Sequence, residues 1–428
     1  MPDLTQTILP RLHQHRLPEL DLGSGMVYPD YHGYSILNLP STICSLLQAP
    51  PLGASPLHRD ILSQLGENAR RVIVVLMDGL ALHRFKRWIT QGGAQVWGDL
   101  LGRGLFSPLT SITPSTTACA LTSLWTGRSA AEHGIMGYEM WIKEYGLVAN
   151  MITHSPMSFA RGSVGSLSLA GFEPQKFMPL RTLGAHLAAS NIATYAMQHH
   201  SIAYSGLSEL LLNNARVHAF STAAEMWINA RRLLESPEPE RFYTWIYWSE
   251  VDHFSHIYSP DDERTQAEFE AFSAAMQKYF LDRLTPRARQ DTVLILTADH
   301  GHLTTRPDAH YELRRHPSLA RRLHIQPSGE NRLAYLFIKP GQSEAVREYI
   351  ERTWPGQFAW LDPAFAVNAG LFGPGALHPN LYERLGDAIL VGRSDAYLWW
   401  ADKDNPLIGR HGGLHPDEML VPFLAVRL

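Results

Sequence analysis

Three aspartates and three histidines lie where a metal-dependent active site would need them. Each follows an apolar run of the sequence or stands beside glycines. They are Asp78, Asp252, Asp299, His256, His300 and His411. Mixed Asp and His ligands that leave coordination positions open are typical of catalytic zinc, whereas closed structural sites favour cysteine. Each residue alone is equally well explained as a helix cap, a turn or a packing residue, but their joint pattern favours a catalytic metal site.

The spacing within this set supports the same interpretation. Asp252 and His256 are four residues apart in SEVDHFSHIYSP, so on a helix they would share one face and could bind one metal. His411 precedes two glycines in IGRHGGLHP, and glycine lets a loop approach a site closely.

A nucleophile candidate lies in PSTTACALTSLWTG, residues 114–127, where hydroxyl groups precede a helix-like segment. The N-terminus of a helix offers free amides and the positive end of a dipole, which suit a phosphate. Ser and Thr are also the favoured N-cap residues, so one of Ser115, Thr116 and Thr117 is expected to cap the helix and another to attack the substrate. Direct zinc coordination would activate such a hydroxyl.

Apolar runs that alternate with helical patterns are expected to position these residues. The predicted strands are RVIVVLM from Arg71, NIATYAM from Asn191, FYTWIYW from Phe242, TVLILTA from Thr292 and a final MLVPFLAVRL. Helical patterns begin after Phe220 and Asp261. Continuous β-branched runs suit strands that are buried on both faces. The fold class is therefore predicted to be α/β, with a mainly parallel central sheet flanked by helices and a small α+β cap insertion. Ligands bind outside the carboxyl ends of strands in such sheets.

The chain is long for one compact domain. We predict an N-terminal wrapping segment over residues 1–70, a catalytic core over 71–324 and 399–428, and a cap insertion over 325–398. Within the cap, RLAYLFIK, FAWLD, DAILVG and AYLWW are strand-like and SEAVREYIERTW is helical.

Composition excludes several functional classes. The 428 residues are 45% hydrophobic and 18% charged, with a formal net charge of −4, which is ordinary for a globular protein and offers no basic surface for nucleic acid. Two cysteines, Cys44 and Cys119, cannot form a disulfide framework. No signal peptide and no membrane-spanning apolar stretch is apparent, so the cytoplasm is the expected location, without membrane or nucleic-acid partners. The sequence does not indicate an oligomeric state.

Six ordered segments resemble the alkaline phosphatase superfamily, and most closely its type I phosphodiesterase/nucleotide pyrophosphatase branch. They are MDG at 77–79, PSTTACALTSLWTG at 114–127, AEHGIMGY at 131–138, DHFSH at 252–256, ADHGH at 298–302 and HGG at 411–413. The resemblance implies two divalent metal ions, usually zinc, with manganese as the alternative.

The resemblance also implies residue roles. Asp252, His256 and His411 would hold one metal, and Asp78, Asp299, His300 and the nucleophile's oxygen would hold the other. Counting back ten residues from Gly127 identifies Thr117 as the nucleophile, with Thr116 as its main rival. Tyr138 stands where nucleotide-cleaving relatives have an asparagine that holds a phosphate oxygen, so its phenol is a candidate donor or a packing residue. His253 and His302 are candidate contacts of the ligands or the substrate.

The predicted function is hydrolysis of a small-molecule phosphate ester, preferably a diester, through a phospho-threonine intermediate. A phosphonate hydrolase or a phosphomonoesterase on the same site is the first alternative, and a phosphomutase shares the fold and ligands. A sulfatase is disfavoured because Cys119 is followed by ALTS instead of the sulfatase motif. The alternative of another class is a catalytically silent protein that binds a metal or ligand.

Overall fold

The computed structural model describes residues 2–66, 68–157, 163–237 and 240–428, and its centre is a seven-stranded sheet. In spatial order the strands are β2 (Leu105–Thr110), β16 (Leu420–Arg427), β9 (Thr292–Thr297), β1 (Arg71–Met77), β8 (Phe242–Trp248), β6 (Ala193–His199) and β7 (Arg216–Phe220). Strands β9, β1, β8, β6 and β7 pair in parallel, and β16 is antiparallel to both of its neighbours. The predicted α/β fold class is confirmed.

The central strands form because their sequences are apolar throughout. All seven residues of β1 and all seven of β8 are buried, as continuous apolar runs predict for strands covered on both faces. The strands predicted at β1, β6, β8, β9 and β16 are all present. The edge strand β7 was not predicted, because its RVHAF alternates poorly and is mostly exposed.

Helices flank the main sheet in two groups whose members contact one another. One group contains α4 (Leu82–Thr90), α5 (Gln95–Arg103), α11 (Ala223–Glu235) and α13 (Glu263–Tyr279). The other contains α2 (Leu39–Leu46), α6 (Thr117–Thr126), α9 (Leu183–Ala188) and α10 (Gly206–Leu211). Side-chain caps fix the starts of both predicted helices, because Thr222 accepts from Glu225 N at α11 and Asp262 accepts from Arg264 N at α13.

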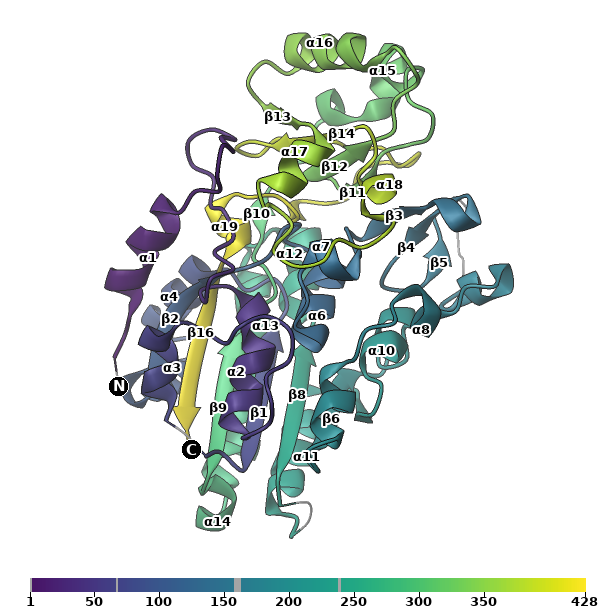
Figure 1. The fold of residues 1–428 in the computed structure, drawn as a ribbon. Helices are drawn as coiled ribbons and strands as arrows, with labels where there is room; N and C mark the ends of the chain where they lie inside the picture. The colour runs from purple at the N-terminus through teal and green to yellow at the C-terminus, as the bar shows by residue number, and fades with distance from the viewer. Residues whose placement is uncertain (1, 67, 158–162, 238–239) are drawn as a thin grey trace.

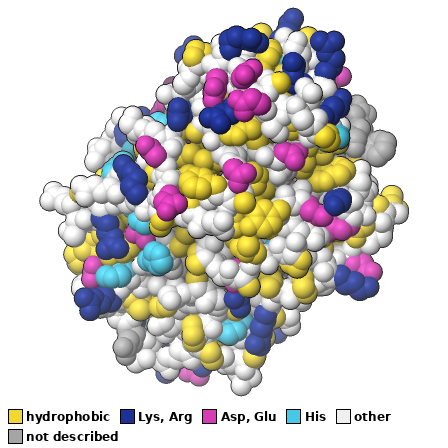
Figure 2. Space-filling view, turned by 45° about the horizontal axis from the view of Figure 1, so that its top comes forward, with side chains coloured by type: hydrophobic (Ala, Val, Ile, Leu, Met, Phe, Trp, Pro, Cys, Tyr) yellow, Lys and Arg dark blue, Asp and Glu magenta, His cyan; other side chains and the backbone are white. Residues whose placement is uncertain are grey.

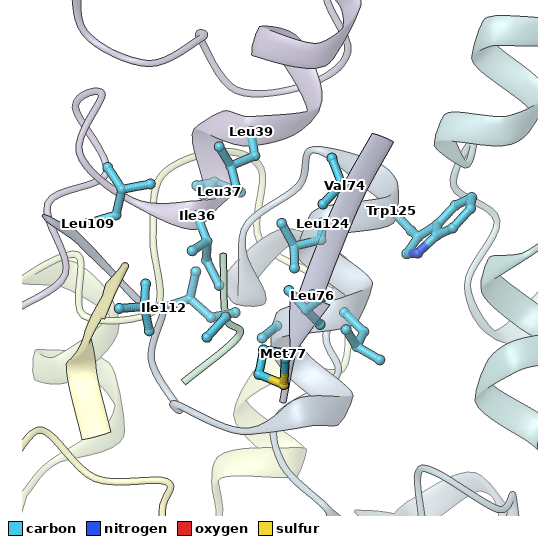
Figure 3. Close-up of a cluster of buried hydrophobic side chains, with 14 of the residues drawn as sticks. Ile36, Leu37, Leu39, Val74, Leu76, Met77, Leu109, Ile112, Leu124 and Trp125 are labelled. Carbon is cyan, nitrogen blue, oxygen red and sulfur yellow. The ribbon is translucent and has the colours of Figure 1, made fainter. Parts of the chain in front are cut away.

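The N-terminal segment contributes directly to the core. Ile36, Leu37 and Leu39 pack among buried side chains of β1, β2 and α6 (Figure 3). The further helices of this segment are α1 (Thr5–Gln14) and α3 (Arg59–Leu65).

A second sheet of seven short strands lies above the carboxyl ends of the parallel strands (Figure 1). This upper sheet has the order β13 (Phe358–Leu361), β14 (Ala388–Gly392), β12 (Leu333–Leu336), β11 (Ser328–Glu330), β3 (Glu139–Ile142), β4 (Leu147–Asn150) and β5 (Ser155–Pro156). It therefore joins strands from the predicted cap, residues 325–398, to strands from residues 139–156. The predicted domain boundaries stay a prediction. The strand-like AYLWW, residues 396–400, forms an isolated bridge at Trp399 and no strand.

The remaining elements are short connectors, apart from α12 and α16. They are α7 (Ala130–His133), α8 (Pro174–Phe177), α12 (Glu250–Tyr258), α14 (Pro286–Arg289), α15 (Pro317–Ala320), α16 (Ser343–Thr353), α17 (Pro363–Asn368), α18 (Leu381–Leu385), α19 (Pro416–Met419) and the ribbon β10 (Leu303–Thr304) with β15 (Gly409–Arg410). No helix in the described part of the chain is long and apolar enough to cross a membrane.

Candidate active site

The ends of β1 and β9 bring together one group of the predicted ligands. Asp78 follows β1, and Asp299 and His300 follow β9 after one residue. His300 Nε2 lies 3.5 Å from Asp78 Oδ1 and 3.5 Å from Asp299 Oδ2, and all three side chains are buried. Ligand atoms from these three residues lie within 4.8 Å of one another, close enough to hold one ion.

A second group forms around Asp252 on helix α12. Its carboxylate lies 3.6 Å from His256 Nε2, 3.8 Å from His411 Nε2 and 2.5 Å from His302 Nε2. The predicted helix and the shared face of Asp252 and His256 are both present. The ligand atoms that lie within 4.8 Å of one another here belong to Asp252, His300, His302 and His411, without His256. His302 is therefore much closer to the site than its sequence position alone indicated.

Backbone carbonyls orient the three predicted histidine ligands. The Nδ1 atoms of His256, His300 and His411 lie 2.9, 3.1 and 3.1 Å from the carbonyl oxygens of Gly409, Gly301 and Ser115. A carbonyl oxygen only accepts, so each Nδ1 carries a proton, which leaves Nε2 as the ring nitrogen that can bind a metal. Metal-binding histidines are characteristically held in this way.

The electrostatics of the cluster also fit a cation. Burial, together with Asp252 and the neighbouring aspartate, raises the pKa of Asp78, and burial likewise raises the pKa of Asp299. Burial and the adjacent His300 and His302 lower the pKa of His411 well below its usual range. Asp78 Oδ1 and Asp299 Oδ2 are buried without a hydrogen-bond partner. Divalent ions at this place would satisfy these oxygens and offset the carboxylate charge.

The start of helix α6 places two threonines at the same cluster. Thr117 is the first residue of the helix, and its Oγ1 lies 3.2 Å from His300 Nε2. Thr116 is the N-cap residue, yet its side chain accepts no capping bond and is hydrogen-bonded to Glu330 instead. The two hydroxyl groups therefore face different partners, and that of Thr117 faces the metal-ligand cluster.

The loop before α6 is fastened to the HGG segment. Ser115 Oγ donates to Gly413 O at 2.8 Å and accepts from Gly412 N at 3.2 Å. Gly412 has φ +110°, and a Cβ there would come within 2.4 Å of the Glu330 side chain. Only glycine allows this close approach between the HGG loop and the upper sheet.

Tyr138 lines the same cavity as Thr117, at the point where the chain enters β3. Its hydroxyl oxygen accepts from Asn150 Nδ2 at 2.6 Å, and its backbone N–H donates to Glu330 Oε1 at 2.7 Å. Burial raises the pKa of Tyr138 to about 12, so the phenol stays protonated. Its proposed role remains a prediction.

Sequence reasoning did not identify two residues that contact the site. Tyr247 of β8 donates its hydroxyl proton to Asp78 Oδ2, and Glu330 of β11 reaches Thr116 and Tyr138. Tyr247 is the hydroxyl-bearing residue nearest the carboxyl end of the otherwise apolar FYTWIYW, which was a signal for it, whereas nothing near Glu330 indicated a site. The predicted contact His253 is exposed and lines the outer cavity.

A cavity of about 700 Å³ opens beside these groups. Asp78, Thr117, Asp252, His256 and His411 lie at its metal-ligand end. The volume is within the range of pockets that hold small organic ligands, and is far larger than one phosphate requires.

An α/β core with two acidic and histidine clusters beside a hydroxyl at a helix N-terminus defines an alkaline-phosphatase-like hydrolase. The sequence profile described as type I phosphodiesterase / nucleotide pyrophosphatase matches residues 72–414. The chain therefore belongs to the type I phosphodiesterase/nucleotide pyrophosphatase family of phosphoric ester hydrolases. This confirms the predicted family and enzyme class, and members of the superfamily use divalent metal ions.

Solved structures show the same fold at low sequence identity. Murine ectonucleotide pyrophosphatase / phosphodiesterase 5, an inactive form in complex with AMP, has a TM-score of 0.59 at 17% identity, covering 83% of this chain and 88% of that chain. Phosphonoacetate hydrolase from Sinorhizobium meliloti 1021 in complex with phosphonoformate has a TM-score of 0.60 at 19% identity, covering 83% and 90%. Among curated protein sequences, none matches.

Proposed function

We propose that this protein hydrolyses phosphodiesters at a two-metal site, with Thr117 as the nucleophile. The observation that carries the proposal is the position of Thr117 Oγ1, 3.2 Å from His300 Nε2 at one end of the cavity. Asp78, Asp299 and His300 would hold one divalent ion, and Asp252, His256 and His411 the other, with His302 orienting Asp252. Zinc suits this mixture of Asp and His ligands, and manganese is the alternative.

The chain's own residues account for two displacement steps. The Thr117 oxygen attacks phosphorus and the first alcohol leaves, which gives a phospho-threonine. Water then attacks the same phosphorus and releases Thr117 with the phosphomonoester. Bound divalent ions would stabilise negative charge on the attacking and leaving oxygens. The free amides at the start of α6 and the Tyr138 phenol are the candidate donors to the non-bridging oxygens.

Charge at the cavity favours a diester over a monoester. The described residues that line the cavity include one lysine, Lys403, and one arginine, Arg410. Arg410 is buried, and its guanidinium already donates to Thr305, Leu407, Asn405 and Asn331. Lys403 is exposed. Among the described lining residues, Lys403 is thus the one cationic side chain available to a phosphoryl group, and one positive charge suits the single charge of a diester better than the two charges of a monoester.

Cavity size separates the diester from a small phosphonate. A compact phosphonate would leave most of the roughly 700 Å³ unfilled, whereas a diester has a second substituent to bury there. We therefore place phosphonate hydrolysis second.

The test is to compare Thr117→Ala and Thr116→Ala on bis-4-nitrophenyl phosphate, 4-nitrophenyl phosphate and a phosphonate monoester. Thr117→Ala should abolish turnover of the diester while the metal content stays near that of the wild type, because only the covalent route is lost. Thr116→Ala should retain activity at a stability cost of about 1 kcal/mol, because it loses the hydrogen bond between Thr116 and Glu330. The opposite pattern would identify Thr116 as the nucleophile, and full activity in both variants would exclude the covalent mechanism.

A further inference from the structure

A buried carboxyl from the upper sheet, that of Glu330, lies at the reacting end of the cavity. Glu330 is the last residue of β11, and it lines the cavity together with Thr116 and Thr117. It is 9% exposed, so the part of its side chain that solvent reaches faces the cavity. Burying a carboxyl costs free energy, and proteins keep such groups mainly where they bind or react.

Three segments at the reacting end hold this carboxyl in place. Its Oε1 accepts from the backbone N–H of Tyr138 at 2.7 Å, and the Thr116 hydroxyl donates to it. Gly412, next to the ligand His411, leaves room for the side chain, because a Cβ on Gly412 would come within 2.4 Å of the Glu330 Cβ. Glu330 is thus fixed between the residue before the nucleophile and the residue after a metal ligand.

The surroundings of Glu330 favour its neutral form. Burial raises the pKa of Glu330 to about 8, and the carboxylates of Glu139 and Asp252 add to the rise. Cys119 and Tyr335 also lie near it, and both stay neutral because burial raises the pKa of each. Glu330 can therefore carry a proton at the pH at which a hydrolase works.

The hydrogen-bonding positions of this carboxyl are divided between the protein and the cavity. A neutral carboxyl donates through one O–H and accepts through the lone pairs of its oxygens. Tyr138 and Thr116 both donate to Glu330, so these contacts use lone pairs and the O–H stays available to an acceptor in the cavity. A non-bridging oxygen of a phosphodiester is such an acceptor, and its negative charge makes the hydrogen bond a strong one.

We infer that Glu330 is a catalytic residue whose carboxyl O–H donates a hydrogen bond to one non-bridging phosphoryl oxygen of the bound diester. The inference rests on the proposed diesterase function, and it adds a donor opposite those at the start of α6. The proton stays on Glu330 throughout the reaction. A fixed donor of this kind stabilises the charge of the transferring phosphoryl group without the reorganisation that water would need.

The distribution of charge on the surface agrees with an uncharged donor. In the view that brings the cap end forward, hydrophobic side chains gather across the middle of the face, with single acidic side chains among them (Figure 2). The lysine and arginine side chains lie mostly toward the edge of this face. Recognition of the phosphoryl group therefore relies more on donors inside the cavity than on positive charge at this surface.

The experiment compares methyl 4-nitrophenyl phosphate with the two enantiomers of its phosphorothioate, in which sulfur replaces one or the other non-bridging oxygen. Sulfur accepts hydrogen bonds weakly. In the metal-loaded enzyme, Glu330→Met should lower kcat/KM for the oxygen ester about ten- to a hundredfold, because a charge-assisted hydrogen bond is lost. One phosphorothioate should show a similar loss. The other, whose sulfur faces residue 330, should lose only about threefold or less, because its hydrogen bond is already weak.

Two further variants assign the effect to the O–H of Glu330. Glu330→Gln should keep kcat/KM for the oxygen ester near the wild-type value, because a carboxamide both donates and accepts. Glu139→Gln is the matched control, since Glu139 is a half-buried carboxyl that lines the same cavity and accepts from Trp400 Nε1. It should leave kcat/KM for all three esters at the wild-type values.

The outcomes separate this inference from the proposed function. An equal loss for all three esters in Glu330→Met, or a wild-type rate for the oxygen ester in that variant, overturns the role of Glu330 and leaves the diesterase intact. A large loss in Glu330→Gln, or the pattern of Glu330→Met in Glu139→Gln, overturns it as well. Failure of the metal-loaded wild type to hydrolyse the oxygen ester overturns the proposed function itself. Where Glu330→Met does not fold, Glu330→Ala gives the same comparison.

Discussion

Replacing Glu330 with glutamine should change how stability depends on pH. Burial raises the pKa of Glu330 from 4.5 to about 8, and Glu139 and Asp252 add to the rise, while hydrogen bonds from Thr116 and the Tyr138 N–H oppose it. The folded protein therefore keeps a proton that the unfolded chain releases above about pH 4.5. Folding takes up a proton in this window, so the stability contributed at low pH is lost as the pH rises toward 8.

The magnitude follows from the difference between the two pKa values. A change from 4.5 to about 8 corresponds to at most about 5 kcal/mol, since one pH unit is about 1.4 kcal/mol. Between pH 5 and pH 8.5 the loss is at most about 4 kcal/mol, relaxation around a buried carboxyl reduces it, and we expect roughly 2–4 kcal/mol. Glu330→Gln keeps an oxygen for the Tyr138 N–H, so the variant should be more stable than the wild type at pH 8.5 by this amount relative to pH 5.

The assay is urea unfolding of chelator-treated protein at pH 5 and pH 8.5. Titrating groups that do not interact with Glu330, such as Asp78, contribute equally to both proteins and cancel in the comparison, so the difference reports Glu330 together with its coupling to Glu139 and Asp252. Glu344→Gln, a change on the exposed first turn of α16, is the matched control and should follow the wild type. Identical pH dependence in Glu330→Gln and the wild type would refute the reasoning.

Three further outcomes are expected. Elemental analysis should find about two divalent ions per chain, and Asp252→Ala and His256→Ala should each lose one. The double variant should lose little more metal than either single variant, whereas additive losses would assign the two residues to different sites. His302→Asn should weaken binding of the ion at Asp252 about 10- to 100-fold, because the Asp252 carboxylate is no longer held by His302. Competition with a chelating dye measures the affinity, and an unchanged value would make His302 a packing residue. Tyr138→Phe should lower kcat for the best diester about ten- to a hundredfold, equivalent to about 1.5–3 kcal/mol, at constant metal content; unchanged rates on the substrate panel would show that Tyr138 only packs.

The site residues could be predicted where their positions depend on nearby sequence, that is, on the end of a strand or on the spacing within one helix. Asp78 and Asp299 could be placed together because both follow apolar strands, and parallel strands end at the same edge of a sheet. The helical spacing of Asp252 and His256 needed only four residues of context. These contacts follow from periodicity and strand direction, which the sequence carries.

Contacts made by the upper sheet were beyond such reasoning. Glu330 is more than 200 residues from Thr116 in sequence, and their contact requires β11 to pair with β3. AYLWW has the composition of a strand, but Trp399 Nε1 donates to Lys403 O and Trp400 Nε1 donates to Glu139, so tertiary hydrogen bonds override its β propensity.

The division between core and upper sheet explains how one site can combine fixed chemistry with variable substrate choice. The ligands Asp78, Asp299 and His300 are attached to the most buried strands, where displacement would disturb the packing of the whole core. Glu330 and Tyr138 instead lie at the ends of short strands of the upper sheet, Glu330 as the last residue of β11 and Tyr138 directly before β3. Substitutions there alter the charge and shape around the transferring phosphoryl group without moving the metal ligands. Selection for a new substituent is therefore expected to act on the upper sheet first, whereas changes in metal content should accompany substitutions of the ligands at the strand ends, on α12 and in the HGG loop.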